Sequence, residues 1–309
     1  MLITWESETE LMLRGRSFAV MHTPNLGDIL IFKADDKWIS KLIAWGTFSD
    51  VSHAAMIYAD GQMVEMGLDG IMDCKIRLGG GAASETAYQM RLTPARDAAP
   101  LIRAANRYLD AKIRYDIPAL VLLGVALIYR HLHPSTRVYH LLEQLLTLAC
   151  MEIDKLIAKL LGHPDAMVCS QFVYQVYQDC GDAYQINIHD GVLQAQASGA
   201  ADGVRLMDFI PQAGAFTLAP LAAGNINVET LCHELYDAVH EAQAARETLP
   251  PPCTLTSTAR GLYERMTDLA KAAGIPLEAL RVMPADLAYH ADNLQRVSEI
   301  EVERLERVR

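Results

Sequence analysis

The sequence predicts an α+β fold in which an antiparallel sheet packs on helices. Between Gly27 and Pro94, short apolar runs alternate with turn residues, which is the pattern of β-strands joined by short connections. Beyond Pro94 the apolar residues recur at helical spacing instead. Antiparallel pairing of these strands is the economical interpretation.

The composition is that of a folded globular protein. Of the 309 residues, 51% are hydrophobic and 21% are charged. A chain of this length favours one enlarged domain or a domain with an appendage. The net charge of -11 has the wrong sign for neutralising phosphates, so we expect no nucleic acid partner. The six cysteines are dispersed without a CxxC pair, and we expect neither a disulfide framework nor a metal or cofactor.

The elements of the predicted sheet can be placed in order. The run GDILIF from Gly27 predicts a strand after a turn, and the stretch DDKWISKLIAW has helical spacing with an aspartate at its start. After Pro94, the segment DAAPLIRAANRYLD predicts a helix. Further strands are expected at residues 51–58, 62–66, 70–78 and 88–94.

The hairpin VSHAAMIYADGQMVEM places two ionisable residues, His53 and Glu65, on two apolar strands. Side chains alternate between the faces of a strand, so the turn decides whether these two residues can meet. A two-residue turn would set Glu65 opposite Met56 and on the other face from His53. A three-residue loop with Gly61 in the left-handed position would set Glu65 opposite Ala55, diagonal to His53 on the same face. The hairpin alone leaves both arrangements open.

Cys169 precedes an amphipathic helix, CSQFVYQVYQ, whose apolar residues recur on one face. A thiol at a helix N-terminus meets backbone N–H groups and the positive end of the helix dipole, which favour the thiolate. A nearby imidazole would complete the activation, and a carboxylate behind the ring would orient it. Cys169, His53 and Glu65 are therefore the candidate catalytic residues.

The stretches LGDILIF, SHAAMIYADGQMVEM and CSQFVYQVY resemble the NlpC-type papain-like superfamily. In ordinary NlpC-type peptidases the cysteine helix precedes the histidine hairpin, whereas Cys169 here follows His53. The chain therefore resembles the circularly permuted YaeF/YiiX-like amidases, to which lecithin:retinol acyltransferase-like enzymes are related. This resemblance covers about half of the chain, from Gly27 to Cys180.

The resemblance implies a permuted papain-like fold and a cysteine amidase or peptidase. Cys169 would attack a carbonyl group to form a thioester, His53 would move the proton, and Glu65 would orient the ring. The substrate would be a peptide or another amide, for example of the peptidoglycan type found in bacterial cell walls. A lipid acyl hydrolase or acyltransferase is the alternative that the acyltransferase relatives imply.

We expect two domains, a catalytic domain over residues 1–214 with a helical insertion at about 117–163, and a helical C-terminal region over 215–309. The insertion contains IPALVLLGVALIYR, whose apolar core of about a dozen residues is shorter than the roughly 20 that a transmembrane helix needs. We therefore expect a buried helix and no transmembrane segment. An apolar flap that contacts lipid is the other interpretation.

The end of the chain, LQRVSEIEVERLERVR, has apolar residues at a spacing that suggests an amphipathic helix. A helix of this kind would suit association with a protein partner, and a catalytically idle scaffold is therefore a further hypothesis. The N-terminal stretch MLITWESETE lacks the features of a secretory signal, so we expect a cytoplasmic protein. Delivery by a specialised secretion system, as for an antibacterial effector toxin, would fit the same observation.

Overall fold

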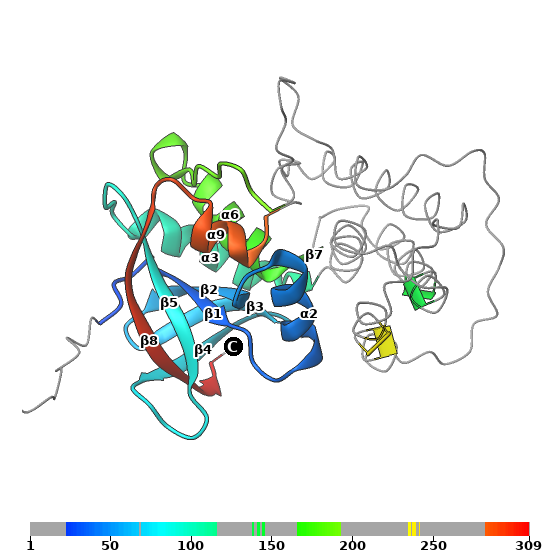
Figure 1. Ribbon diagram of the computed structural model, residues 1–309. Coiled ribbons are helices and arrows are strands. Elements are labelled where there is room, and N and C mark those ends of the chain that lie inside the picture. The colour runs from blue at the N-terminus through cyan, green and yellow to red at the C-terminus, as the bar shows by residue number, and fades with distance from the viewer. Residues whose placement is uncertain are drawn as a thin grey trace, which may run out of the picture.

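The computed structural model describes residues 23–67, 69–115, 138, 141–142, 144–145, 166–192, 234–235, 237–238, 241 and 282–308. Its centre is a closed barrel of six antiparallel strands in the order β1-β2-β3-β4-β8-β5 (Figure 1). The strands are β1 (Ile29–Lys33), β2 (Val51–Ala59), β3 (Gln62–Gly67), β4 (Gly70–Leu78), β5 (Glu85–Leu92) and β8 (Leu294–Arg307).

Four helices with described bounds lie beside this barrel. They are α2 (Trp38–Thr47), α3 (Ala99–Ala111), α6 (Cys169–Gln178) and α9 (Pro284–Tyr289). A short 3-10 helix, η1 (Asp182–Tyr184), follows α6, and a parallel two-residue pair joins β6 (Arg114–Tyr115) to β7 (Ala166–Met167). The antiparallel sheet and its helices confirm the predicted α+β class.

Two apolar clusters follow from the alternation of side chains along the strands. One fills the barrel and takes residues from all six strands, for example Leu30, Ile57 and Val302. The other lies outside the barrel, where Ile29 and Ile31 pack with residues of α3, α6 and α9. Figure 1 shows these three helices together over one side of the barrel. The helix that begins with Cys169 is thus held against β2 and β3.

Polar side chains lie inside the barrel near the start of β1. Asp28 is buried and accepts two hydrogen bonds from Arg91, at 2.7 Å each, and one from the side-chain amide of Gln89 at 2.6 Å. It also accepts the backbone N–H of Asn25, as expected for a turn and strand-start residue. Because every carboxylate oxygen has a partner, the charge is tolerated inside the barrel.

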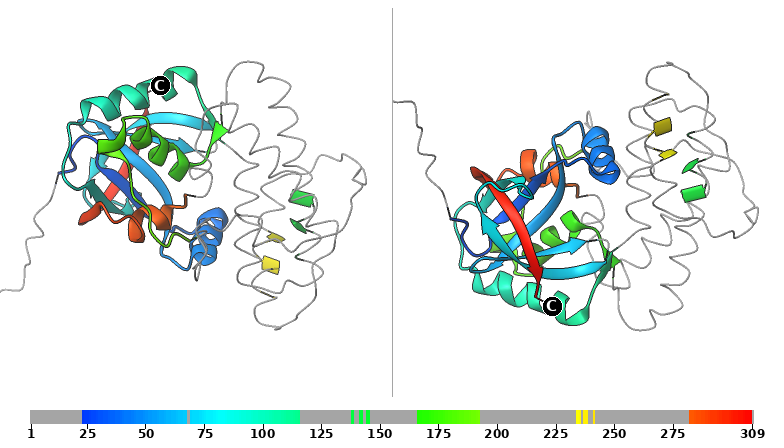
Figure 2. Two further views of the ribbon diagram at one scale, coloured as in Figure 1. Left: turned by 90° about the horizontal axis from the view of Figure 1, so that it is seen from above. Right: turned by 90° about the horizontal axis from the view of Figure 1, so that it is seen from below.

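The C-terminal stretch differs from the prediction. The helix expected over LQRVSEIEVERLERVR is wrong, because residues 294–307 form β8, which pairs with β4 and β5. The alternation of Ile300 and Val302 with Glu301 and Glu303 has the period of two that suits a half-buried strand. Figure 2 shows β8 in red beside strands from the first third of the chain. Residues 294–307 therefore belong to the barrel and not to a separate helical region.

This result also removes the surface proposed for a partner helix. Its apolar positions were Leu294, Val297, Ile300, Leu305 and Val308. In the strand they are divided between the two faces, so Ile300 packs against the barrel core whereas Leu305 is exposed.

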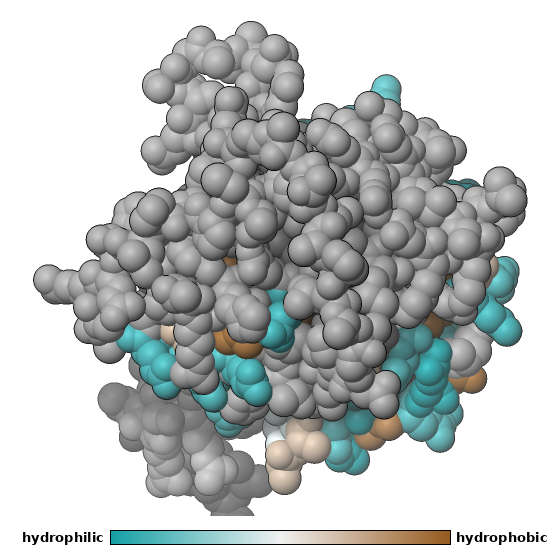
Figure 3. Space-filling model, turned by 90° about the vertical axis from the view of Figure 1, so that its right-hand side faces the viewer, coloured by the Kyte–Doolittle hydropathy of each residue, from teal (hydrophilic) through white to brown (hydrophobic). Residues whose placement is uncertain are grey.

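Most of the expected helical insertion at about 117–163 lies outside the described residues, as does most of the region 215–281. The described positions within the insertion are helical, and Val138, Leu141, Leu142 and Leu145 among them are buried. Within the described part of the chain, no helix is long and apolar enough to cross a membrane. On the face in Figure 3, the described surface is mainly hydrophilic, with hydrophobic residues in small separate patches.

Candidate active site

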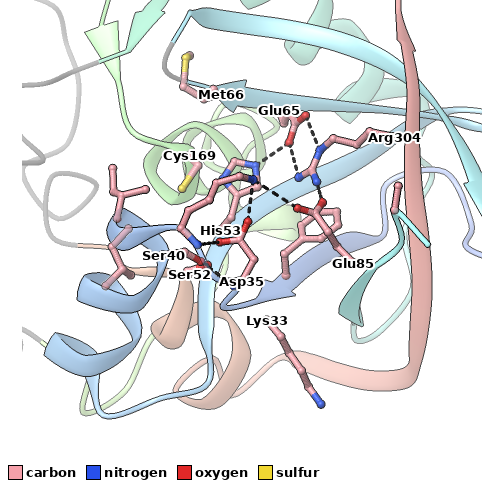
Figure 4. Close-up of a pocket in the computed structure, with 16 residues that line it drawn as sticks. Lys33, Asp35, Ser40, Ser52, His53, Glu65, Met66, Glu85, Cys169 and Arg304 are labelled. Carbon is pink, nitrogen blue, oxygen red and sulfur yellow. Dashed lines mark hydrogen bonds and ion pairs between the residues drawn. The ribbon is translucent and has the colours of Figure 1, made fainter. Parts of the chain in front are cut away.

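The structure brings Cys169, His53 and Glu65 together at one open cavity of about 470 Å³ (Figure 4). The cavity lies where the barrel meets α2 and α6. His53 and Glu65 come from the hairpin β2–β3, and Cys169 comes from the first position of α6. All three predicted residues therefore face one space, although Cys169 is far from the other two in the sequence.

The turn of the hairpin has the geometry that allows the two residues to meet. Ala55 pairs with Glu65 across the strands, and Gly61 has φ +63° in the turn. A register shift between Ile57 and Ala59 accommodates one extra residue in β2. The turn itself holds two residues, Asp60 and Gly61, because Ala59 pairs with Gln62. The shift within β2 supplies the odd residue, so the register is the one that the three-residue alternative predicted, and Glu65 lies diagonal to His53 on the face that lines the barrel interior.

His53 and Glu65 form a short hydrogen bond. Nε2 of His53 lies 2.6 Å from Oε2 of Glu65. Because Nε2 is engaged in this way, the other ring nitrogen, Nδ1, is the one available to the thiol. The ring of Phe32 lies beside the imidazole, with 5.8 Å between ring centroids, and limits its movement on one side. The neighbour of His53, Ser52, bonds Ser40 of α2 at 2.6 Å, and both serines line the same cavity.

Cys169 is fixed by the helix that it opens. The predicted buried face of α6 is confirmed, since Phe172, Val173 and Val176 are fully buried. Two hydrogen bonds anchor the helix at its ends: Ser170 Oγ donates to the carbonyl of Val282 at 2.6 Å, and the Tyr177 hydroxyl donates to the carbonyl of Gly27. Cys169 is only 4% exposed. Little rotation of α6 is possible, so the sulfur stays beside the ring.

The electrostatics of the site favour a thiolate and an imidazolium. Burial alone would raise the pKa of Cys169, but the charge and hydrogen bond of His53, helped by the N–H groups of Ala54 and Ser170, lower it below its ordinary value. Burial alone would lower the pKa of His53, but the charge and hydrogen bond of Cys169, together with those of Glu65, raise it to about 9. Each group therefore stabilises the charged form of the other.

Glu65 is buried and ionised. Burial acts to raise its pKa, but hydrogen bonds and charges from His53 and then from Arg304 lower it to about 2. Arg304 donates from Nε to Oε1 and from Nη2 to Oε2, both at 3.0 Å. The Cys74 thiol lies 3.8 Å from Oε1 as a weak additional donor. The carboxylate thus has partners on both oxygens while it faces the ring.

Sequence reasoning missed Arg304 because it placed this residue on a helix outside the catalytic domain. On β8, Arg304 follows Val302 on the inward face and reaches the site opposite Ile76. The alternation of apolar and acidic residues just before it was the available signal. If residues 294–307 form a strand, Arg304 lies two positions after Val302 and must face the same side, which is the barrel interior.

The rest of the cavity has an apolar wall and a charged rim. Ile39 and Ile43 of α2, together with Met66, provide apolar surface near the thiol. On the rim, Lys37 forms ion pairs with Asp35 at 2.7 Å and with Glu85 at 3.8 Å. Figure 4 shows that Lys33, although it lines the cavity, points its ammonium away from Cys169, His53 and Glu65. The cavity can therefore hold an apolar group close to a polar reacting centre.

Two other described cysteines lack the properties of Cys169. Burial, and then the charge of Glu65, raise the pKa of Cys74 to about 12. Burial, and then the charge of Asp179, raise the pKa of Cys180 above its ordinary value. Among the residues that the structure describes, no group of three or more His, Cys, Asp or Glu side chains is arranged to hold a metal ion.

In comparisons with known proteins, no family model, no curated protein and no solved structure matches this chain.

Proposed function

We propose that the protein is a cysteine hydrolase that acts on an amide through a thioester intermediate. The observation that carries this proposal is a thiol at a helix N-terminus that interacts with an imidazole, whose other nitrogen bonds a buried carboxylate at 2.6 Å. Such a set has the parts of a nucleophile, a base and an orienting residue. In this assignment Cys169 is the nucleophile, His53 the acid and base, and Glu65 the residue that orients the ring.

The proposed reaction has two steps. The Cys169 thiolate adds to the carbonyl carbon, and as the C–N bond breaks, the His53 imidazolium gives its proton to the departing amine. The neutral ring then takes a proton from water, whose oxygen attacks the thioester carbonyl. The C–S bond breaks and releases the carboxylic acid, which restores the Cys169 thiolate and the His53 imidazolium. The backbone N–H of Cys169, in the first turn of α6, is a donor for the oxyanion.

We also propose that the fold is a permuted papain-like one. The motif order, with the histidine hairpin before the cysteine helix, supports this, as does a closed barrel with that helix packed on two of its strands. The substrate class that we infer from this likeness is a peptide or peptidoglycan-type amide.

The proposal can be tested by trapping the acyl-enzyme. The protein would be mixed briefly with peptidoglycan fragments, quenched in acid and digested, and Cys169 examined by mass spectrometry. An added acyl group on Cys169, absent from a Cys169→Ala variant, is the expected result. Release of new amines should fall by at least about 1,000-fold in that variant, because the nucleophile is gone.

Cys180 supplies a matched control, because it lies just after the same helix and is more exposed than Cys169. With iodoacetamide at pH 6.5, Cys169 should react first despite its burial, since it is the thiol with the lowered pKa. A Cys180→Ala variant should keep wild-type activity. Preferential labelling of Cys180, or amine release that survives Cys169→Ala, would contradict the proposed function.

A second candidate function rests on the apolar wall of the cavity. Ile39, Ile43 and Met66 line the space beside Cys169, and this surface suits an apolar acyl group. We therefore keep a lipid acyl hydrolase or acyltransferase as the alternative. Phospholipid vesicles in the same trapping experiment separate the two, because a fatty acyl adduct on Cys169 without amine release from peptidoglycan would favour the lipid reaction.

A further inference from the structure

Arg304 is held on three sides at the edge of the site. Its Nε and Nη2 atoms form a two-point contact with Glu65, and its Nη1 atom pairs with Glu85 (Figure 4). The guanidinium also stacks on Phe32, with 4.3 Å from Cζ to the ring centroid. A side chain fixed in this way has one orientation, so it can fix the orientation of the group that it binds.

The contact with Arg304 restricts the Glu65 carboxylate to one orientation. Both oxygens lie against the guanidinium fork, and Oε2 is the oxygen that also bonds His53. If the carboxylate rotated, it would lose at least one charge-assisted hydrogen bond inside the protein, where few replacements exist. The plane of the carboxylate, and with it the position of the His53 ring, is therefore set by Arg304, which lines the same cavity and bonds Glu65.

We propose that Arg304 is a positioning residue that holds Glu65 in the orientation in which Oε2 faces His53, and that β8 thereby completes the active site. This inference rests on the proposed function, because it assigns a role within the same catalytic set. Arg304 acts through Glu65 and contributes no group to the reaction.

Two roles for Arg304 predict opposite changes at His53. If Arg304 acted by charge alone, its removal would take a cation away from the imidazolium, and the pKa of His53 would rise. If Arg304 positions Glu65, its removal lets the carboxylate move or take up a proton, the imidazolium loses its partner, and the pKa of His53 falls from about 9. The direction of the change therefore identifies the role.

The experiment compares wild type, Arg304→Gln, Arg304→Lys and Arg77→Gln. Arg77, on β4, pairs with Glu303, which is next to Arg304 on β8. Because Arg77 lies on the exposed outer face of the barrel, its substitution is the matched control. The titration of His53 would be followed by NMR of histidine-labelled protein, with the signal assigned by its loss in a His53→Gln variant. The rate at which iodoacetamide alkylates Cys169 at pH 7 would be measured in parallel.

In Arg304→Gln we expect His53 to titrate at a lower pH than in wild type and Cys169 to react about ten-fold more slowly. Arg304→Lys should recover only part of this rate, because lysine keeps the charge but lacks the planar fork. Arg77→Gln should behave as wild type. An upward shift of the His53 titration, no shift, or full recovery by lysine would each overturn the positioning role.

The two proposals fail in different ways. If Cys169 forms an acyl adduct but Arg304→Gln leaves the His53 titration unchanged, the positioning role is wrong and the hydrolase assignment stands. If Arg304→Gln shifts the titration downward but no substrate acylates Cys169 and Cys169→Ala retains activity, the hydrolase assignment is wrong.

Discussion

Glu65 is the residue whose charge state most directly couples the candidate site to stability. Its carboxylate is ionised although only 6% of its side chain is exposed, and His53 and Arg304 supply the compensating hydrogen bonds. Its pKa of about 2 in the folded protein lies below the ordinary value of 4.5. The stabilisation from ionised Glu65 is therefore fully present above about pH 4.5 and is lost as the pH falls through about 2.

A Glu65→Gln variant tests this coupling. At pH 7 we expect the free energy of unfolding to fall by about 3 kcal/mol, because a buried ion pair loses one partner. The difference from wild type should shrink between pH 4.5 and pH 2, as the wild-type carboxylate takes up its proton. Urea unfolding at several pH values, followed by circular dichroism, would measure it.

Glu303→Gln is the control, because Glu303 forms an ion pair with Arg77 at the surface. That pair should contribute at most about 1 kcal/mol. A constant difference between wild type and Glu65→Gln from pH 7 to pH 2 would show that the charge of Glu65 is not the source of its stabilisation.

The charge of His53 makes stability depend on pH in the opposite direction to the charge of Glu65. The pKa of His53 is raised from 6.5 to about 9, so the stabilisation from the imidazolium is fully present below about pH 6.5 and is lost as the pH rises through about 9. Alkylation of Cys169 by iodoacetate, an anion that reacts faster beside an imidazolium, should therefore decline above about pH 9. A rate that keeps rising to pH 11 would show that no imidazolium assists the thiol.

For single residues, the sequence indicated three members of the candidate site and missed a fourth, Arg304. His53, Glu65 and Cys169 were predicted because each carries a local signal, such as a strand position, a turn or a helix start. Arg304 could not be chosen in the same way, because arginine in a charged segment is ordinary at a protein surface. Its role depends on a strand pairing that brings residues from opposite ends of the chain together.

Among the elements, the turn before β1 determines how closely the barrel and α3 can approach. Gly27 has φ +83°, and a Cβ atom there would lie 2.9 Å from Cδ1 of Leu101. The N–H of Gly27 donates to the carbonyl of Ile57 at 2.9 Å, so the backbone has little freedom to move away. Gly61 also has a positive φ, but a Cβ atom there would meet only the Ile76 carbonyl oxygen, at 3.9 Å.

The two glycines therefore form a matched pair. Gly61→Ala should cost about 1 kcal/mol of stability through backbone strain alone. Gly27→Ala should cost roughly 1–3 kcal/mol more, because it adds a steric conflict with Leu101 to the same kind of strain. Equal urea midpoints for the two variants would mean that Leu101 and α3 move aside without a loss of stability.

Some helices and strands were predicted less well from the sequence than others. The hairpin register was left open between two turns, and the ladder with Ala55 opposite Glu65 resolved it. The stretch 294–307 was wrongly predicted to be a helix, because its apolar residues fit a helical spacing loosely. Only the centre of the stretch has the alternation of a strand. Short charged segments of this kind leave the choice to tertiary pairing.

For the whole molecule, the decisive feature is that β8 pairs on both sides, with β4 and with β5. A closed barrel has no free edge, so its strands should open together. In hydrogen exchange followed by mass spectrometry, backbone amides around residues 298–302 should exchange as slowly as those around 29–31. A separate appendage would exchange faster, and such a result would contradict the closure.

The general fold class was predictable, whereas the closure was not. Strand-forming runs from Gly27 onward indicated an antiparallel sheet, and the structure contains one. A local pattern gives no information on which distant segment completes a sheet, because the favourable energy lies in pairs such as Ala87 with Ile300. For the same reason, the sequence did not show that residues 294–307, expected in a helical C-terminal region, complete this barrel.

The place of β8 in the chain also has a consequence for biosynthesis. Strands β4 and β5 leave the ribosome some 200 residues before the segment that joins them, so a nascent chain carries two unpaired edges meanwhile. Contacts across such a separation form slowly. Folding in the cell should therefore depend on protection of these edges, and chaperone depletion should aggregate this protein more readily than one whose barrel is built from neighbouring strands.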